Sequence, residues 1–221
     1  MDAEIQTVYI EGDGFAWRSK ERPSADPTPL DPIALRMAIA QPANRAAVYV
    51  SRPCQFASDL RLTGCRLSHW TNERFSQQII DVMSAALDRL KHEGHARSFQ
   101  LVGYSGGGAV ALLLAAQRMD VVRVVTVAGN LDTKAWTLHH GVTSLDGSLN
   151  PADAAARLQH VAQVHLVGAR DRVMPPSIAQ SYVQRFPPGE RPQVHVMDNF
   201  EHRCCWAESW PQLWSTWVAD P

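Results

Sequence analysis

The fold is decided by the stretch Phe99-Gln100-Leu101-Val102-Gly103-Tyr104-Ser105-Gly106-Gly107. Residues 99–102 form an apolar run typical of a strand, and the small and apolar residues at 108–116 are typical of a buried helix. A G-x-S-x-G sequence between a strand and a helix indicates a nucleophile elbow, a sharp turn that exposes the serine hydroxyl. We therefore predict Ser105 as a catalytic nucleophile. A glycine-rich turn without chemistry is the alternative.

Further apolar runs on both sides of this stretch indicate the rest of a sheet. They lie at residues 7–10, 46–50, 121–127, 161–167 and 194–196, and several are apolar almost throughout, as strands buried on both faces are. Helical patterns follow at 72–92, 109–118 and 176–185. Strands that alternate with helices predict an α/β fold, with a doubly wound, mostly parallel sheet of about six strands flanked by helices.

A last helix carries Trp210, Leu213, Trp214 and Trp217 on one face. We interpret this face as core packing of the C-terminal helix. A strip of aromatic side chains that binds a ligand is the alternative.

The bulk composition indicates one globular domain over residues 1–221. Hydrophobic residues make up 45% of the chain, charged residues 19%, and the net charge is −1. These values argue against disorder and against an electrostatic surface for nucleic acid. No apolar run approaches the roughly 20 residues of a membrane-spanning helix. The sequence gives no indication of an oligomeric state.

The start of the chain and its cysteines bear on the compartment. Residues 1–5 have neither the basic region nor the apolar core of a signal peptide, so a cytoplasmic location is expected. Four reduced thiols are the favoured reading of Cys54, Cys65, Cys204 and Cys205, which form no zinc-type pair. A Cys54–Cys65 disulfide is the alternative, and with a preceding leader it would indicate an exported or periplasmic protein.

An acid that orients the catalytic base is expected on a loop that leaves a strand beyond Ser105. Catalytic groups of open α/β sheets gather outside the carboxyl ends of the strands. The run at 164–167 leads into Gly168-Ala169-Arg170-Asp171-Arg172-Val173-Met174-Pro175, which puts Asp171 on such a loop. We predict Asp171 as this acid. The alternatives are an Asp171 that caps a turn or pairs with an arginine, and Asp132 as the acid.

A histidine must accept the serine proton, because a neutral hydroxyl is a poor nucleophile. Of the nine histidines, His202 follows the last strand at the point where a loop can return over the sheet edge, so we predict His202 as the base. His165 and His195 lie inside strand runs and are expected to be structural. His139 and His140 have no acidic or cysteine ligand at metal spacing, so no metal is expected. Their segment is interpreted as a solvated loop, with a mobile segment touching substrate as the alternative.

An oxyanion hole is the remaining requirement for acyl transfer. Gly106 supplies one backbone N–H. The second is expected from Asp13 or Gly14 in the glycine-containing loop after the first strand, where small residues let the backbone approach a substrate. The residues expected to touch substrate are Tyr104, Phe15 and His139.

Together, Gly103-Tyr104-Ser105-Gly106-Gly107, Asp171 and His202 resemble the α/β-hydrolase superfamily of serine hydrolases, in chain order and in placement after strands. The resemblance extends over nearly the whole chain and, more loosely, is to bacterial esterase- and lipase-like members. It implies hydrolysis of an ester, thioester or amide through an acyl-enzyme, without a cofactor, on a small-molecule acyl substrate.

Two features depart from the family pattern. Typical members have eight strands, whereas here the oxyanion strand begins near Met1, so a sheet reduced at the N-terminus is expected, with a longer natural protein as the alternative. Glu11-Gly12-Asp13-Gly14 replaces the more usual H-G-x-G, and its acidic side chains disfavour an anionic substrate close by.

We therefore expect a carboxylesterase-like serine hydrolase. The alternatives are a thioesterase or peptidase of the same fold, a non-catalytic binding protein of hydrolase-like fold, and metal-assisted hydrolysis through His139 and His140.

Overall fold

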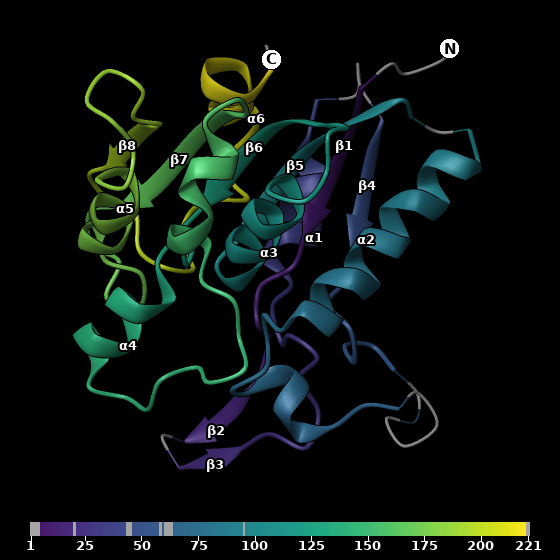
Figure 1. The fold of residues 1–221 in the computed structure, drawn as a ribbon, viewed down its shortest axis with the longest axis vertical. Helices are drawn as coiled ribbons and strands as arrows, with labels where there is room; N and C mark the ends of the chain where they lie inside the picture. The colour runs from purple at the N-terminus through teal and green to yellow at the C-terminus, as the bar shows by residue number, and fades with distance from the viewer. Residues whose placement is uncertain are drawn as a thin grey trace.

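Six parallel strands form the central sheet of the chain (Figure 1). The structure is a computed structural model, and it describes residues 5–19, 21–42, 46–57, 59, 64–94 and 96–219. The strands are β1 (Ile5–Ile10), β4 (Ala47–Val50), β5 (Ser98–Tyr104), β6 (Val121–Val127), β7 (Ala162–Gly168) and β8 (Gln193–Met197), in the spatial order β4-β1-β5-β6-β7-β8. The predicted doubly wound sheet of about six strands is confirmed. A separate antiparallel pair consists of β2 (Trp17–Ser19) and β3 (Arg22–Pro23).

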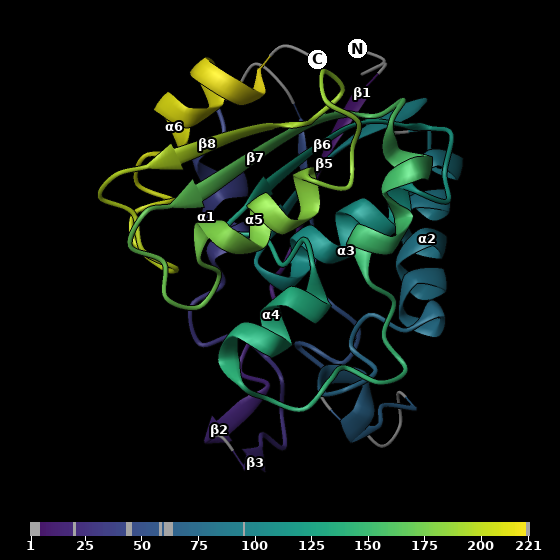
Figure 2. The ribbon, with the colours of Figure 1, turned by 60° about the vertical axis from the view of Figure 1, so that its left-hand side comes forward.

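Helices cover both faces of this sheet, as Figure 2 shows. On one face lie α1 (Ile33–Ala40) and α6 (Trp210–Leu213), the latter continuing as a π-helical turn over Trp214–Val218. On the other lie α2 (Gln77–His92), α3 (Gly106–Ala115) and α5 (Pro176–Val183). Two 3-10 segments, Leu67–Trp70 and Pro151–Leu158, and the short α4 (Thr133–His140) complete the described elements.

Side-chain alternation on β5 divides the core between the two faces. Phe99 and Leu101 pack into the cluster beneath α2 and α3, whereas Val102 and Tyr104 pack into the cluster beneath α1 and α6. All four side chains are buried because β5 lies between β1 and β6. The apolar run at residues 99–102 therefore lies in the middle of the sheet.

The C-terminal tryptophans belong to the core. Trp210 has 0% of its surface exposed and Trp214 has 2%. The Trp210 indole donates a hydrogen bond of 2.8 Å to the Tyr9 hydroxyl, which in turn donates to Gln41 at 2.8 Å. The interpretation of this face as core packing is confirmed.

Several helices differ from the predictions. The helix predicted at 109–118 is α3 at Gly106–Ala115, the one predicted at 176–185 is α5 at Pro176–Val183, and α1 was not predicted. The helix predicted at 72–92 begins at Gln77, because the Ser76 hydroxyl accepts a hydrogen bond from the Ile79 N–H at 3.4 Å and caps it there. The segment around His139 and His140 is a helix, α4, and not a solvated loop. Asp132 caps its first turn, and Gly141, with φ 59°, ends it. The prediction of a loop was wrong because it relied on apolar periodicity, and the residues that cap this helix, Asp132 and Gly141, are not part of such a pattern.

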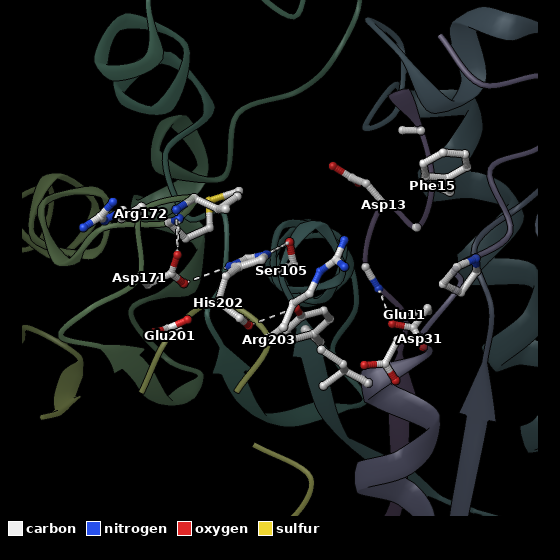
Figure 3. A pocket seen from close by; sticks show the side chains of 18 of the residues that line it. Glu11, Asp13, Phe15, Asp31, Ser105, Asp171, Arg172, Glu201, His202 and Arg203 are labelled. Atoms are coloured by element: carbon white, nitrogen blue, oxygen red, sulfur yellow. Dashed lines mark hydrogen bonds and ion pairs between the residues drawn. The ribbon is translucent and has the colours of Figure 1, made fainter. Parts of the chain in front are cut away.

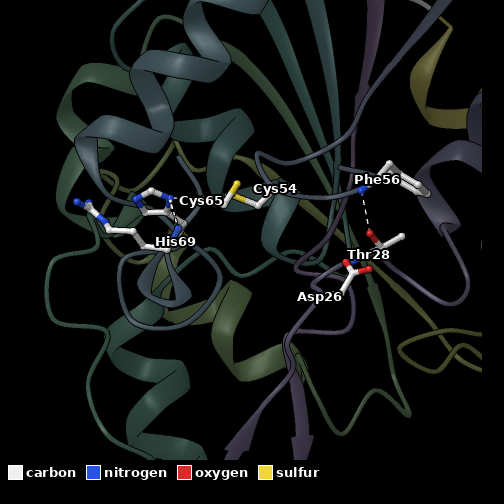
Figure 4. The surroundings of a disulfide bond; sticks show 7 residues. Asp26, Thr28, Cys54, Phe56, Cys65 and His69 are labelled. Carbon is white, nitrogen blue, oxygen red and sulfur yellow. Dashed lines mark hydrogen bonds between the residues drawn. A yellow bond between two sulfur atoms is a disulfide. The ribbon is translucent and has the colours of Figure 1, made fainter. Parts of the chain in front are cut away.

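The cysteines pair as Cys54–Cys65 and Cys204–Cys205, and none is free. The favoured reading of four reduced thiols was therefore wrong. Figure 4 shows the Cys54–Cys65 bond beside His69, in a segment where the Phe56 N–H donates to the Thr28 hydroxyl at 2.8 Å. No helix in the described part of the chain combines the length and apolarity of a membrane span.

Replacing the buried tryptophan of α6 tests this packing. Trp210→Ala should lower the free energy of unfolding by about 3–5 kcal/mol, because it empties a large core site and removes the partner of Tyr9. Chemical denaturation followed by circular dichroism measures the change. Trp17→Ala, at a side chain 40% exposed, is the control and should change the stability by less than about 1 kcal/mol. Equal losses in the two variants would contradict this packing.

Candidate active site

One edge of the sheet collects the predicted site residues, because the carboxyl ends of parallel strands meet there. β1 ends at Ile10 and leads into the segment with Asp13 and Gly14. β5 leads into Ser105, β7 into the loop with Asp171, and β8 into the loop with His202. Sequence positions almost 200 residues apart thus come to one place.

Ser105 occupies a backbone conformation that few non-glycine residues adopt. Its φ is 51° and its ψ is −119°, between the end of β5 and the start of α3. The turn is tight: a Cβ atom at Gly103 would collide with the Gly107 backbone, and one at Gly107 would collide with the Ile10 carbonyl oxygen. Only glycine fits these two positions, which is the geometry that a nucleophile elbow requires.

Ser105, His202 and Asp171 form a hydrogen-bonded chain (Figure 3). The Ser105 Oγ lies 3.1 Å from the His202 Nε2, and the His202 Nδ1 lies 2.8 Å from the Asp171 Oδ2. Asp171 is buried, and its Oδ1 accepts the N–H groups of Val173 at 2.8 Å and Met174 at 2.7 Å. The carboxylate is thereby fixed with one oxygen toward the imidazole.

The loop of His202 is held from beneath. The carbonyl oxygen of His202 accepts hydrogen bonds from the Tyr104 hydroxyl at 3.0 Å and from the Trp206 indole N–H at 3.1 Å. Trp206 is fully buried, so the loop is anchored in the core. Tyr104, predicted to touch substrate, lines the cleft and at the same time positions this loop.

Asp132, the rival acid, serves another part of the structure. It accepts hydrogen bonds from the Ala135 N–H at 3.1 Å, the Ser181 hydroxyl at 2.6 Å and the Asn150 amide at 3.1 Å. It joins α4 to α5 and makes no contact with His202 among the described residues.

Three backbone N–H groups are available at the positions predicted for oxyanion donors, those of Gly106, Asp13 and Gly14. The Gly106 N–H follows Ser105 at the first position of α3, where no helical acceptor exists. Within the described chain, the N–H groups of Asp13 and Gly14 have no acceptor, whereas that of Gly12 donates to the Glu11 carboxylate at 2.9 Å. Asp13 lies against Gly106, where an added Cβ atom would collide with its carboxylate. Gly14 is more exposed, with φ 66°.

The Asp13 carboxylate is held by two buried arginines. Arg74 Nη1 lies 2.8 Å from one oxygen and Arg52 Nη1 lies 3.2 Å from the other. Burial acts to raise the pKa of Asp13, but the charges and hydrogen bonds of Arg74 and Arg52 outweigh burial and hold that pKa below its ordinary value. Asp13 is therefore ionised, and the backbone of its loop is fixed in place.

The segment that follows the disulfide-bonded Cys54 also holds the loop after β1, through a hydrogen bond. The Gln55 amide donates a hydrogen bond of 2.9 Å to the Gly12 carbonyl oxygen, and Gln55 directly follows Cys54. The guanidinium of Arg52 also hydrogen-bonds the backbone carbonyl of Arg74. Two later segments, residues 52–55 and the turn with Arg74, therefore converge on the residues after β1.

These groups open into a cleft of about 980 Å³. Ser105, Asp171, His202, Asp13, Gly14, Tyr104 and Phe15 all line it. Gly106, the next residue after Ser105, is buried and is not among the residues that line the cleft. His139 does not reach this cleft; its ring contacts His140 at 4.9 Å, and its side chain is exposed. The prediction for His139 is corrected, because α4 turns Trp136 toward the cleft in its place.

The chemistry of His139 and His140 also bears on metal binding. The described residues contain no group of three or more His, Cys, Asp or Glu side chains placed to hold a metal ion. His140 Nε2 lies 2.8 Å from the Val173 carbonyl oxygen, to which it can donate a hydrogen bond.

Sequence reasoning missed Arg52 and Arg74. Both lie in irregular segments, where a buried arginine has the same sequence signature as a solvated one. Their partner Asp13 was identified only as a backbone donor. No periodicity or motif links these three positions, and only the fold brings them together.

The ion pairs of Asp13 predict an acid-sensitive contribution to stability. A carboxyl group whose pKa is lowered by folding stabilises the protein above its unfolded value of 3.8, and that contribution is lost as the pH falls through the lower folded value. Asp13→Asn should cost about 3–5 kcal/mol near pH 7, because two buried arginines lose their counter-charge. Urea denaturation between pH 7 and pH 2 measures both effects.

Asp153→Asn is the control, because Asp153 pairs with Lys134 at 2.7 Å on the exposed surface. It should cost less than about 1 kcal/mol. The free energy of unfolding of Asp13→Asn should fall less steeply below pH 4 than that of the wild type. If the two fall equally steeply, the acid sensitivity comes from other carboxylates.

Comparisons with known proteins agree with this architecture. No family model and no curated protein matches the sequence. Solved structures do match. Est1E from Butyrivibrio proteoclasticus with ferulic acid bound has a TM-score of 0.63 and 11% sequence identity, over 99% of this chain and 91% of that one. An alpha-beta serine hydrolase homologue from Coxiella burnetii has a TM-score of 0.60 and 14% identity, over 99% of this chain and 86% of that one. The esterase domain of a Rhodothermus marinus protein is similar at 0.60 and 12%, over 99% and 85%. Identities this low speak to fold alone, and the chain has the α/β-hydrolase fold.

Proposed function

We propose that the protein is a serine hydrolase that cleaves a carboxylic ester through an acyl-enzyme. The observation that carries the proposal is the chain from Ser105 Oγ to His202 Nε2 at 3.1 Å and from His202 Nδ1 to Asp171 Oδ2 at 2.8 Å. This chain supplies a nucleophile, a base and a carboxylate that orients the base. The esterase and serine hydrolase structures of the same fold support the proposal.

Acylation begins when the Ser105 hydroxyl attacks the ester carbonyl carbon and its proton passes to the His202 Nε2. Asp171 keeps the other imidazole nitrogen protonated and stabilises the imidazolium that forms. The negative charge on the carbonyl oxygen is accepted by the N–H groups of Gly106 and Asp13. The carbon–oxygen bond then breaks, and the His202 proton passes to the leaving alcohol.

Deacylation repeats the sequence with water. His202 removes a proton from a water molecule, the hydroxide attacks the acyl carbon, and the bond to Ser105 Oγ breaks as His202 returns the proton to it. The open cleft of about 980 Å³ leaves room for this water. No cofactor takes part in any of these steps.

The oxyanion site gains from its electrostatic surroundings. Arg52 and Arg74 carry two positive charges against the single negative charge of Asp13, so the cluster beside Gly106 has an excess of one positive charge. A fixed positive potential stabilises negative charge that develops during attack more than it stabilises a neutral ester.

A non-catalytic protein of the same fold is the competing hypothesis. A binding protein has no need for a strained serine at φ 51° or for a carboxylate that is buried behind a histidine. Thioesterase or peptidase activity would use the same residues and differ only in the leaving group.

An activated serine reacts with a fluorophosphonate probe, and this reaction tests the proposal directly. The folded wild type should be labelled at Ser105 near pH 7.5, as peptide mass spectrometry will locate. Ser105→Ala should not be labelled and should lower kcat for 4-nitrophenyl esters by roughly 10³–10⁶-fold. Ser209→Ala, at a serine outside the cleft, is the matched control. An unlabelled Ser105 in folded protein would reject the mechanism.

The two candidate acids can be separated by mutation. Asp171→Asn should lower kcat by roughly 10²–10⁴-fold, because the imidazole loses the carboxylate that fixes its tautomer. Asp132→Asn should change kcat by less than about threefold, because Asp132 holds α4 and α5 and does not contact His202. Steady-state kinetics on a 4-nitrophenyl ester measures both. The opposite pattern would transfer the role of the acid to Asp132.

A further inference from the structure

Arg203 brings a positive charge to the floor of the cleft. It directly follows His202, is exposed, and lines the same cavity as Ser105. Figure 3 shows its guanidinium directed into the cleft, in the space between Ser105 and the segment with Glu11 and Asp13. Burial raises the pKa of Tyr104, and the charge of Arg203 opposes that rise, so the guanidinium acts electrostatically on the residue beside Ser105.

The Arg203 guanidinium has no protein partner among the described residues. Some nearby arginines differ: Arg52 and Arg74 hold Asp13, and Arg36 pairs with Asp31 at 3.0 Å. Arg170 and Arg172 also line the cleft, and like Arg203 their guanidinium groups have no partner among the described residues. A guanidinium offers five N–H donors in a planar fork that matches a carboxylate. In Arg203 all of these donors are available to a ligand.

The carboxylates beside Arg203 are already engaged. Glu11 accepts the Gly12 N–H at 2.9 Å and the Tyr49 hydroxyl at 3.2 Å, and burial raises its pKa. Asp13 is neutralised by its two arginines. The reason given above for disfavouring an anionic substrate, the acidic loop after β1, therefore does not hold in the folded protein.

Asp31 and Glu201 are further acidic side chains that line the cleft. Asp31 is paired with Arg36 at 3.0 Å, which leaves Glu201 to be considered. Glu201 is exposed, and Figure 3 shows its carboxylate on the Asp171 side of His202, away from the Arg203 guanidinium. Arg172 lines the cleft too, but its guanidinium points away from Ser105 in the same view. Of Arg172 and Arg203, the two cleft arginines labelled in Figure 3, Arg203 is the one that faces the reacting groups.

The Arg203 guanidinium lies on the side of Ser105 where the acyl part of a substrate would bind. His202 must reach the leaving oxygen, so the alcohol part lies on the side of His202 and Asp171. The Arg203 guanidinium lies on the opposite side of Ser105 in Figure 3. Apolar side chains also form part of the cleft wall: Phe15, which Figure 3 shows on that side of Ser105, and Trp17, Pro29, Leu30 and Ile33. A methylene chain can pack on this wall while its end reaches the guanidinium.

The geometry points to Arg203 as a specificity-determining residue that selects esters whose acyl chain carries a second, negatively charged group, such as the hemiester of a dicarboxylic acid. The inference rests on the proposed function. A bidentate hydrogen bond between the guanidinium and the free carboxylate would hold the acyl chain across the cleft.

Chain-matched substrates test the inference: 4-nitrophenyl hemiadipate, which ends in a carboxylate, and 4-nitrophenyl hexanoate, which does not. The ratio of their kcat/KM values should fall by about 10- to 100-fold in Arg203→Gln, because a charged hydrogen bond is lost. Arg203→Lys should retain part of the ratio. Arg191→Gln, at an exposed arginine outside the cleft, should leave it within about twofold. A ratio unchanged in Arg203→Gln overturns the inference.

Failure of the proposed function would look different. In that case neither ester is hydrolysed by the wild type above the rate of Ser105→Ala. Binding of monomethyl adipate, measured by calorimetry on wild type and Arg203→Gln, then decides the role of Arg203 without turnover. Binding weakened about tenfold or more by the substitution supports the anion site, and equal binding by the two proteins rejects it. Circular dichroism of each variant establishes that it is folded.

Discussion

The left-handed backbone at Ser105 is the constraint on which the site depends. Such a conformation costs a non-glycine residue on the order of 1–3 kcal/mol and persists only where its surroundings impose it. Here the Ser105 N–H donates to the Val127 carbonyl oxygen at 2.9 Å, and the Ser105 carbonyl oxygen accepts the N–H groups of Gly108 and Asn130, each at 3.0 Å. β5, β6 and α3 therefore hold the turn together, and the side chain is left pointing out of the sheet edge toward His202.

The same packing sets the opposite wall of the cleft. Because Gly107 lies against the Ile10 carbonyl oxygen, the end of β1 comes close to the start of α3, and the loop after β1 crosses in front of Gly106. The Arg52–Asp13–Arg74 cluster then fixes that loop from behind. Charge and close packing thus act on one short segment.

The sequence predicted the parts of this arrangement that are local or periodic. All six strands of the sheet follow from apolar runs, and the turn at Ser105 follows from glycines that only a tight strand-to-helix turn requires. The positions of Asp171 and His202 followed from chain order and from the shared edge of a parallel sheet. Their roles in catalysis stay predictions, although the distances among the three side chains suit them.

What the sequence analysis did not predict has two sources: local helix caps that carry no apolar period, and contacts between distant segments. The caps of α4 at Asp132 and Gly141 turned an expected loop into a helix, which carried Trp136 and not His139 to the cleft. Partners of Glu11 and Asp13 come from two later segments, residues 49–52 and the turn with Arg74, so the charges of the linear sequence alone misrepresent the cleft. Only the fold shows which charges are compensated. The proposed base His202 and Arg203, whose charge has no partner among the described residues, are neighbours on one loop. Trp206 and Tyr104 anchor this loop to the core through their hydrogen bonds to the His202 carbonyl oxygen. The same anchored backbone would therefore position both a substrate carboxylate bound by Arg203 and the imidazole of His202.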